Sequence, residues 1–301
     1  MTFKFGLAHA PLTPFENGRI DYAAYAKILD FHTRHGAEAL ALPMHAGESV
    51  SLTAGERQQL LDFAIQHVAG RIPIVAHVSE AGTEIAASLA AHAKKAGASA
   101  LIATVPYYWT PPQHMLVEHF DAIGKAGALP FFVLNTPGDM ADVEFAPKSI
   151  VELIHKLPNF AGLIDTSLDW QYMIEVVTVA RAERADFQFV SGTEYMISAS
   201  AVGATGLVSS LSSVAPELVR ELYDLCRAER YAAARPLQED AASLFRLMRD
   251  GGVSALKAAA ALVNRPCGDP RPPLVALHNK DGLYRSMSEA KTFNKEPRGW
   301  S

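Results

Sequence analysis

The segment "IPIVAHVSEAGTEIAASLAAHAKKAGASALIAT", residues 72–104, contains the pattern that indicates the architecture. It begins with an apolar run of strand length at 72–77 and ends with a second one at 98–104. A stretch of helix length lies between them. Strands that are apolar on both faces are buried on both sides, and a helix between two of them is typical of a parallel sheet covered by helices.

The same alternation continues in both directions along the chain and repeats eight times. The predicted strands lie at 5–10, 37–43, 72–77, 98–104, 130–135, 160–165, 187–192 and 205–210. The segments between them, such as 21–36 and 55–70, carry apolar residues at spacings of three and four, as amphipathic helices do. Eight strand–helix units within about 225 residues favour a closed (β/α)8 TIM barrel over an open sheet.

From about residue 215 onward the chain reads as helical and rich in alanine until "NRPCGDPRPP", residues 264–273, and a short charged tail follows. No linker separates this part from the rest. We expect the barrel to occupy residues 1–225 and a C-terminal helical extension, residues 226–301, to pack on it.

Composition excludes several classes of function. The net charge is -5 and lysine and arginine are scattered, so neither a nucleic acid nor a membrane surface is an expected partner, and a small molecule is. Cys226 and Cys267 lack metal-type spacing and are interpreted as reduced thiols of a cytoplasmic protein. The first residues lack the pattern of a signal peptide, and no apolar run reaches the roughly 18 residues that span a bilayer.

In such a barrel the chemistry lies where strands end and the following loops begin. The polar residues at these junctions include many histidines and carboxylates: His9, Thr13, His45, Glu48, Ser49, His77, Ser79, Tyr107, Tyr108, Asn135, Asp165, Thr166, Ser191, Glu194 and Ser209. These are the candidate functional residues.

Eight motifs follow one another in an order and spacing that resemble the dihydrodipicolinate synthase and N-acetylneuraminate lyase family, a class I aldolase-like family. They are "LTPFENGRID", "MHAGESVSLTAGER", "GRIPIVAHV", "VPYYWTPPQHMLVEHF", "LPFFVLNTPG", "PNFAGLIDTS", "FVSGTE" and "GATGLVSSLSSVAPE". The resemblance covers roughly residues 6–230. It implies a TIM barrel with a C-terminal helical bundle, usually a homotetramer, that acts on 2-oxo acids through a Schiff base to a lysine.

The residues that carry this chemistry in the family are replaced here. The family motif G-hydrophobic-K-E/D reads Gly-Leu-Ile-Asp at 162–165, so Ile164 stands in place of the lysine. An isoleucine has no lone pair, and no carbinolamine can form on it. The motif Y-N-x-P reads Leu-Asn-Thr-Pro at 134–137, so Leu134 replaces the phenol that relays protons.

Two further family features are altered. The motif G-T-T-G-E, whose hydroxyls bind the substrate carboxylate, reads Met-His-Ala-Gly-Glu at 44–48. Asp139 stands where synthases carry an arginine that pairs with a carboxylate, which inverts the preference for an anion. None of the eleven lysines ends a predicted strand, and Lys257, which resembles a lysine of the family's C-terminal region, is expected to be structural.

Two hypotheses from different classes remain. In the first, the protein is a lyase that cleaves a C–C bond or removes water from a small oxygenated carbonyl or oxo-acid compound, with His45 and Asp165 as acid and base and Asn135 beside them. His9, His45 and His77 are then candidate ligands of a divalent metal, while pyridoxal phosphate and nucleotides are not expected. In the second hypothesis, the protein is a non-catalytic homologue that binds a small molecule.

The remaining interpretations concern single residues. Residues expected to contact the substrate are Ala10, Ala46, Glu48, Tyr107, Leu134, Asp139, Ile164, Gly192, Glu194 and Ser209. For Glu48 a structural role in the loop after the second strand is favoured, and for His77 a hydrogen-bonded structural role is an equal alternative. Tyr107 and Tyr108 match a segment that reaches a neighbouring subunit in the family, so we expect a homotetramer or homodimer. We expect four histidines on outer helices to be solvated or to cap a helix: His32, His35, His114 and His119.

Overall fold

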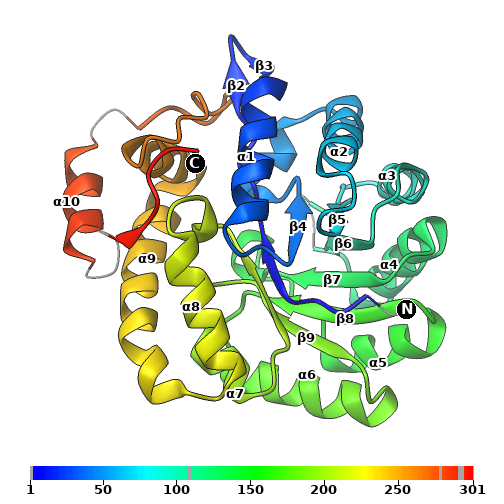
Figure 1. Cartoon of the computed structure of the whole chain (residues 1–301). Helices are drawn as coiled ribbons and strands as arrows, with labels where there is room; N and C mark the ends of the chain where they lie inside the picture. The colour runs from blue at the N-terminus through cyan, green and yellow to red at the C-terminus, as the bar shows by residue number, and fades with distance from the viewer. Residues whose placement is uncertain (1–2, 108–109, 278–279, 291–294, 301) are drawn as a thin grey trace.

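The computed structural model describes residues 3–107, 110–277, 280–290 and 295–300. Eight parallel strands close into a barrel in the order β1-β10-β9-β8-β7-β6-β5-β4, and β1 also pairs with β4 (Figure 1). Their bounds are β1 Leu7–His9, β4 Ala39–Leu42, β5 Ile74–His77, β6 Ala100–Thr104, β7 Phe131–Asn135, β8 Phe160–Asp165, β9 Gln188–Ser191 and β10 Gly206–Ser209. The predicted (β/α)8 TIM barrel is therefore confirmed.

A helix follows each strand and covers the outside of the barrel (Figure 1). These helices are α1 Tyr22–Arg34, α2 Ala54–Val68, α3 Thr83–Ala96, α4 Gln113–Gly127, α5 Pro147–Lys156, α6 Trp170–Glu183, α7 Met196–Ala201 and α8 Pro216–Arg227. Local sequence sets several of their ends. Thr53 and Glu56 form a capping box at the start of α2, and Gly97, at φ +101°, ends α3 in the left-handed conformation.

The sequence patterns missed the small elements. A hairpin of β2 Phe15–Glu16 and β3 Arg19–Ile20 projects after β1, and its turn consists of Asn17 and Gly18, both at positive φ. Four short 3-10 helices lie in the loops that follow the strands: η1 His45–Gly47, η2 Ser49–Ser51, η3 Pro137–Asp139 and η4 Leu211–Ser213. Two-residue strands and single turns are too short for hydrophobic periodicity to detect.

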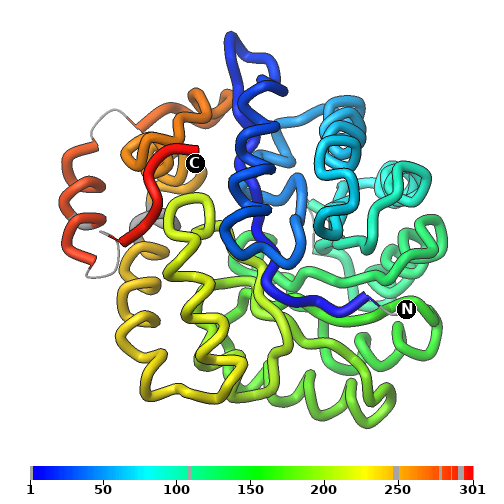
Figure 2. Tube along the Cα trace, viewed as in Figure 1, coloured from blue at the N-terminus to red at the C-terminus, as the bar shows by residue number. Residues whose placement is uncertain are grey.

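The C-terminal part consists of the long helix α9 Tyr231–Leu262, which breaks its helical geometry at Gly252, and α10 Asp281–Glu289. Figure 2 shows the end of the chain returning beside α8. There the guanidinium of Arg265 donates to the carbonyl of Pro297, and that of Arg34 donates to Trp300. The boundary between barrel and extension at residues 225 and 226 stays a prediction. Helix α8, the last helix of the barrel, continues across it to Arg227. Within the described ranges, no helix is both long and apolar enough to cross a membrane.

The core has one layer inside the barrel and a second layer between the strands and the helices. Two consecutive phenylalanines of β7 each belong to one of these layers. Phe132 packs on Phe5 at a ring distance of 4.9 Å and closes the bottom of the barrel from inside. Phe131 packs instead on Phe120 of α4, at 6.0 Å, between the strands and the helices. Since successive side chains of a strand point to opposite faces, this fixes which residues of every paired strand face inward.

Candidate active site at the carboxyl end of the barrel

The inner wall near the mouth is hydrocarbon on three adjacent strands. Leu134 of β7 pairs in register with Ile164 of β8, and Ile164 pairs with Val190 of β9. Leu134 lies two residues after the inward-facing Phe132, so all three side chains point into the barrel. Ile164 and Val190 are 0% exposed, and Leu134 is half-buried. The position at which the resemblance expects an amine thus lies among apolar side chains.

Asn135 and Asp165 lie on the opposite face of the same strands. The amide of Asn135 donates to Oδ1 of Asp165 at 2.8 Å, and its oxygen accepts from the backbone N–H of Phe145 at 3.0 Å. The ring of Phe145 packs on Phe120 of α4 at 5.1 Å. This hydrogen-bonded pair therefore faces the helical layer and does not line the barrel interior.

Asp165 has a full set of structural partners. Its Oδ2 accepts from the hydroxyl of Ser167 at 2.8 Å, and its backbone oxygen accepts from the N–H of Gly192 at 2.7 Å. Burial raises the pKa of Asp165, while the hydrogen bonds from Asn135 and Ser167 act in the opposite direction. The carboxylate links the end of β7 to the loop after β8, and the backbone oxygen of the same residue links β8 to the residue that follows β9.

His45 lies on the other side of the mouth. It is the first residue of η1, after β4, and it is exposed. β4 and β8 are four strands apart in a ring of eight, which places them across the barrel from each other. The structure therefore does not bring His45 together with Asp165, because they belong to opposite walls and Asp165 points outward.

The three histidines named as candidate metal ligands diverge. His9 points outward, where its Nδ1 lies 3.0 Å from Nδ1 of His32 on α1. Burial lowers the pKa of His9 to about 3, so the ring is neutral. His77 faces inward from β5, and His45 is exposed in its loop. In the part of the chain that the structure describes, no three His, Cys, Asp or Glu side chains are grouped as metal ligands are, so we derive no step through a metal.

His77 is held in one tautomer by its neighbours. Its Nδ1 lies 2.9 Å from the carbonyl of Pro43, which can only accept, so Nδ1 carries the proton. Its Nε2 then accepts from the hydroxyl of Ser79 at 2.7 Å, and that hydroxyl accepts from the N–H of Thr104 at 2.8 Å. Burial, and secondly the charge of Arg57, lower the pKa of His77 to about 3. Both ring nitrogens are satisfied in the neutral form.

Glu48 ties the loop after β4 to the C-terminal part of the chain. Its Oε1 forms a buried ion pair with Nζ of Lys257 at 2.6 Å, and its Oε2 accepts from the N–H of Arg271 at 2.8 Å. The ammonium of Lys257 also lies 4.3 Å from the ring centre of Phe15. Lys257 is the single buried lysine of the described residues, and this pairing commits its ammonium to Glu48. Both residues thus have the structural role that the sequence favoured.

Glu194 and Ser209 form a second structural pair after β9 and β10. The hydroxyl of Ser209 donates to Oε1 of Glu194 at 2.7 Å, and the N–H of Leu211 donates to the same oxygen at 3.0 Å. Burial raises the pKa of Glu194. Ser209 pairs in register with the outward-facing His9 and so faces away from the barrel interior.

The remaining predicted contact residues are spread around the mouth. Ala10 and Ala46 are buried, and Tyr107 is half-buried with its hydroxyl 3.3 Å from the carbonyl of Ser79. Asp139 is exposed, and its Oδ2 accepts from the hydroxyl of Thr136 at 2.9 Å. The interpretation of Tyr108 falls outside the described residues.

At Gly192 a larger residue has no room. An added Cβ would lie 2.5 Å from Cγ2 of Thr166 and 3.1 Å from the backbone oxygen of Asp165. The glycine therefore permits the close approach of β9 to the end of β8.

Comparison with known proteins supports the same architecture. A family model described as the dihydrodipicolinate synthetase family matches residues 4–288. The 4-hydroxy-tetrahydrodipicolinate synthase of Bartonella bacilliformis is 33% identical over 276 residues, which cover 90% of this chain and 92% of the relative. That of Afipia carboxidovorans is 30% identical and covers 95% and 96%. The chain belongs to the dihydrodipicolinate synthetase family.

Solved structures of the family agree with this assignment. The crystal structure of dihydrodipicolinate synthase from Aquifex aeolicus has a TM-score of 0.91 at 26% identity and covers 98% of this chain and 99% of its own. A structure described as the first monomeric dihydrodipicolinate synthase variant has a TM-score of 0.90 at 26% identity, covering 95% and 96%. The architecture of the dihydrodipicolinate synthetase family is therefore retained across the whole chain.

Against this family background, sequence reasoning missed a hydroxyl on the inner wall. Thr104 ends β6 beside Leu134, and its side-chain oxygen is buried without a hydrogen-bond partner among the described residues. The signal was present, because Thr104 is the last residue of a predicted strand. The expectation that His32 and His119 are solvated was wrong, since His32 packs on His9 and His119 bonds Thr83 Oγ1 at 2.9 Å, both buried.

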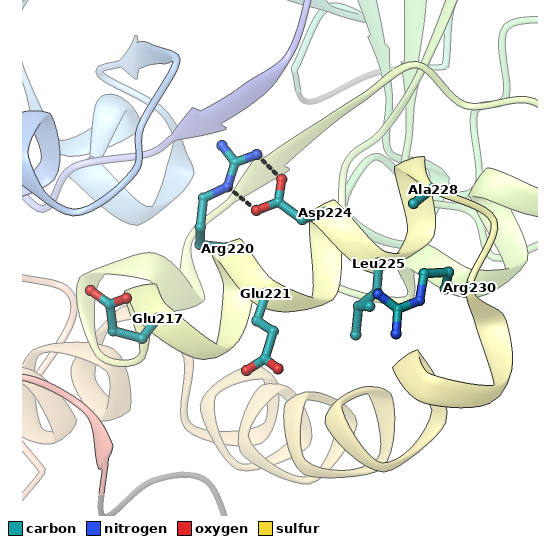
Figure 3. Close-up of a pocket in the computed structure, with 7 residues that line it drawn as sticks. All are labelled: Glu217, Arg220, Glu221, Asp224, Leu225, Ala228 and Arg230. Carbon is teal, nitrogen blue, oxygen red and sulfur yellow. Dashed lines mark hydrogen bonds and ion pairs between the residues drawn. The ribbon is translucent and has the colours of Figure 1, made fainter.

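Two pockets lined by described residues lie away from the mouth of this family barrel. One, of about 470 Å³, is lined by Glu217, Arg220, Glu221, Asp224, Leu225, Ala228 and Arg230. Figure 3 shows these side chains along α8 and the turn that follows it, with Arg220 paired to Asp224. The other, of about 10 Å³, lies between β4, β5 and the helices outside them. In the first pocket, Arg220 is paired with Asp224, and Glu217 is paired with His35 at the end of α1, so these charges are already engaged within the chain.

Proposed function

We propose that this chain is a lyase that acts on a small oxygenated carbonyl or oxo-acid compound without a lysine Schiff base. The reaction is cleavage of a C–C bond or loss of water. Membership of the dihydrodipicolinate synthetase family supports the class of reaction. The observation that carries the departure from imine chemistry is the burial of Ile164 on the inner wall between Leu134 and Val190.

In this proposal His45 is the acid–base group. Without an iminium, the developing negative charge on the substrate oxygen needs a hydrogen-bond donor, and an imidazole can both donate and accept a proton. The exposure of His45 on η1, at the mouth, supports this role. Asn135 and Asp165 act as positioning residues, because their hydrogen bonds hold β7, β8 and Phe145 in place.

The experiment that tests this proposal is a turnover assay on 2-oxo acids, hydroxy-oxo acids and sugar acids with the variant His45→Ala. General acid–base catalysis contributes about 10²- to 10⁴-fold, so kcat is expected to fall by that factor. His114→Ala is the matched control, since His114 is also exposed but lies on α4. Equal turnover by both variants would remove His45 from the mechanism.

A second candidate, a non-catalytic homologue that binds a small molecule, is favoured by one observation. The buried polar side chains around the mouth serve the fold: Asp165 bonds Asn135 and Ser167, and His77 bonds Ser79 and the Pro43 carbonyl. A compound that raises the unfolding temperature and is never turned over would support this candidate. Turnover of any compound in the assay above would exclude it.

We also propose a homotetramer or homodimer in the cytoplasm. Three large apolar side chains near the start of α6, Leu168, Trp170 and Ile174, are 44%, 48% and 43% exposed. We call these three residues the α6 patch. Exposed apolar side chains that cluster support a protein–protein contact. Both cysteines are buried free thiols, which supports a reducing compartment.

A further inference from the structure

The β6 side of the barrel mouth carries a hydroxyl that the chain does not satisfy. Thr104 is 2% exposed, and its Oγ1 has no hydrogen-bond partner among the described residues. Buried hydroxyls almost always have partners, so an unpaired one points to a partner from outside the chain. Four hydroxyls are buried without a hydrogen-bond partner among the described residues. Those of Tyr25, Thr193 and Ser213 lie on α1, in the loop after β9 and on η4, and Thr104 alone belongs to a barrel strand.

The register places Thr104 on the inner wall. Leu101 lies three residues earlier on the same strand. Its side chain packs on Gly127 of α4, where an added Cβ would lie 2.2 Å from Cδ1 of Leu101, so Leu101 points outward. Alternation along β6 then turns Thr104 inward. Its partner across the strand pair is Leu134, which is half-buried, so the opening of the barrel reaches this level. Ile164 is the next residue in the same row.

The strand residues that face the barrel interior around this hydroxyl carry no formal charge. The guanidinium of Arg57, on α2, is committed to the backbone carbonyls of His77 and Ser79 and to the carboxylate of Glu80. By the same alternation, the last inward-facing residue of each strand is Ala8, Ala41, His77, Thr104, Leu134, Ile164, Val190 or Val208. Of these only His77 can titrate, and burial lowers its pKa to about 3, so it is neutral. A carboxylate at this depth would lose its hydration and find no cation among them.

We propose that the Thr104 hydroxyl binds the oxygen of an uncharged carbonyl or hydroxyl group, while the hydrocarbon part of the same ligand packs on Leu134 and Ile164. This inference rests on the proposed function, because it takes the barrel mouth as the substrate site. It adds that the uncharged end of the substrate enters the barrel first. A carboxylate of the same compound stays on the solvent side, near His45.

The test compares methyl pyruvate, which is uncharged, with pyruvate by titration calorimetry and thermal unfolding. Wild-type protein is expected to bind methyl pyruvate more tightly than pyruvate. Thr104→Val keeps the shape of the side chain and removes the hydroxyl, so the affinity for methyl pyruvate is expected to fall by about 5- to 10-fold. Thr104→Ser keeps the hydroxyl and is expected to stay within about 3-fold of wild type.

A second readout uses the ligand-free protein. Because the hydroxyl has no partner there, Thr104→Val is expected to unfold at the same or a higher temperature than wild type. A clear fall in that temperature would show that the hydroxyl is already satisfied and would overturn the inference. So would equal affinity of the valine variant and wild type for methyl pyruvate, a preference for pyruvate, or no binding of methyl pyruvate. Turnover in the assay of His45→Ala reports on the proposed function separately.

Discussion

Ile164 determines what chemistry the barrel can offer. Its side chain is fully buried, faces inward and has Leu134 and Val190 beside it in the sheet. A hydrocarbon at this place contributes packing and no nucleophile. The half-buried leucine next to it likewise gives no hydroxyl to relay protons. This part of the inner wall is therefore apolar on β7, β8 and β9.

The first prediction concerns the polarity around Ile164. Ile164→Lys is expected to lower the free energy of unfolding by about 3–5 kcal/mol, because it buries an ammonium without a counter-ion. Ile164→Met is the matched control of similar length without charge, and it is expected to cost less than about 1.5 kcal/mol. Urea unfolding at neutral pH measures both. Equal losses would show that water or an anion reaches this position.

The second prediction concerns His77 and pH. The pKa of His77 is about 3 in the folded protein and near 6.5 in the unfolded chain. Between these values the unfolded chain binds the proton and the folded protein does not, so this histidine stabilises the fold fully above pH 6.5 and progressively less as the pH falls towards 3. Between pH 7 and pH 5 its contribution is expected to drop by about 1–2 kcal/mol.

His77→Gln isolates this effect, because glutamine can donate and accept but does not titrate. Urea unfolding at pH 7 and pH 5 is expected to show a smaller acid loss for the variant than for wild type. The buried His9 and His32 remain in both proteins and cancel in the comparison. Parallel losses in the two proteins would mean that His77 is protonated in the folded state.

Single residues differed in how well their roles could be predicted. Structural roles for Glu48 and Lys257 were predicted from the sequence, and the buried ion pair between them supports these roles. The burial of His32 did not, because a histidine in a helix counts as polar until its partner is known. That partner, His9, lies 23 positions away in the chain. Contacts of this kind depend on tertiary structure, which periodicity does not contain.

The loop after β4 depends on the C-terminal part of the chain. Glu48 has a left-handed backbone conformation, φ 57°, and its carboxylate is held by Lys257 of α9 and the backbone of Arg271. The guanidinium of Arg271 also pairs with Glu56 of α2 at 2.6 Å. The segment that presents His45 is therefore fixed by residues more than two hundred positions later in the chain.

The third prediction tests this attachment. Lys257→Met leaves the Glu48 carboxylate buried without its cation, so the free energy of unfolding is expected to fall by about 3–5 kcal/mol. Lys156→Met is the control: its partner Glu118 is exposed, and a surface pair of this kind contributes little to stability. Urea unfolding compares the two variants. A small loss for Lys257→Met would show that the pair is not needed to hold the loop.

All eight predicted strands exist, most of them one or two residues shorter than their apolar runs. The apolar pattern located them because both faces of each strand are buried. The same pattern could not tell which face a residue occupies. Ile164 and Asp165 are neighbours in one motif, yet the first faces the barrel interior and the second faces the helices. One step along a strand separates a wall of the mouth from the outer layer.

The whole molecule leaves its exposed apolar side chains mainly on the side of the mouth. Six exposed apolar residues of the described part of the chain lie in the loops that follow strands or in the first turns of the next helix: Val50, Ile85, Met115, Leu168, Trp170 and Ile174. Trp170 and Ile174 are four residues apart on α6 and share one face of that helix. The α6 patch is therefore the place where we expect two copies of the chain to meet.

The fourth prediction follows from this patch. Trp170→Glu places a charge in the expected contact and is expected to reduce the molecular mass in solution, measured by sedimentation or light scattering, to that of a smaller assembly. Val275→Glu is the control, because Val275 is 72% exposed and lies in the C-terminal segment. An unchanged mass for Trp170→Glu, or a monomeric wild type, would remove the α6 patch from the assembly.

The claim that the barrel works without a lysine imine has a direct test. Wild-type protein is incubated with pyruvate and sodium borohydride, which reduces an imine to a stable amine, and its intact mass is measured, with a lysine-bearing member of the family as positive control. Since Ile164 has no amine and Lys257 is paired with Glu48, we expect the mass to stay unchanged. A pyruvate adduct mapped to any lysine at the mouth would contradict the account.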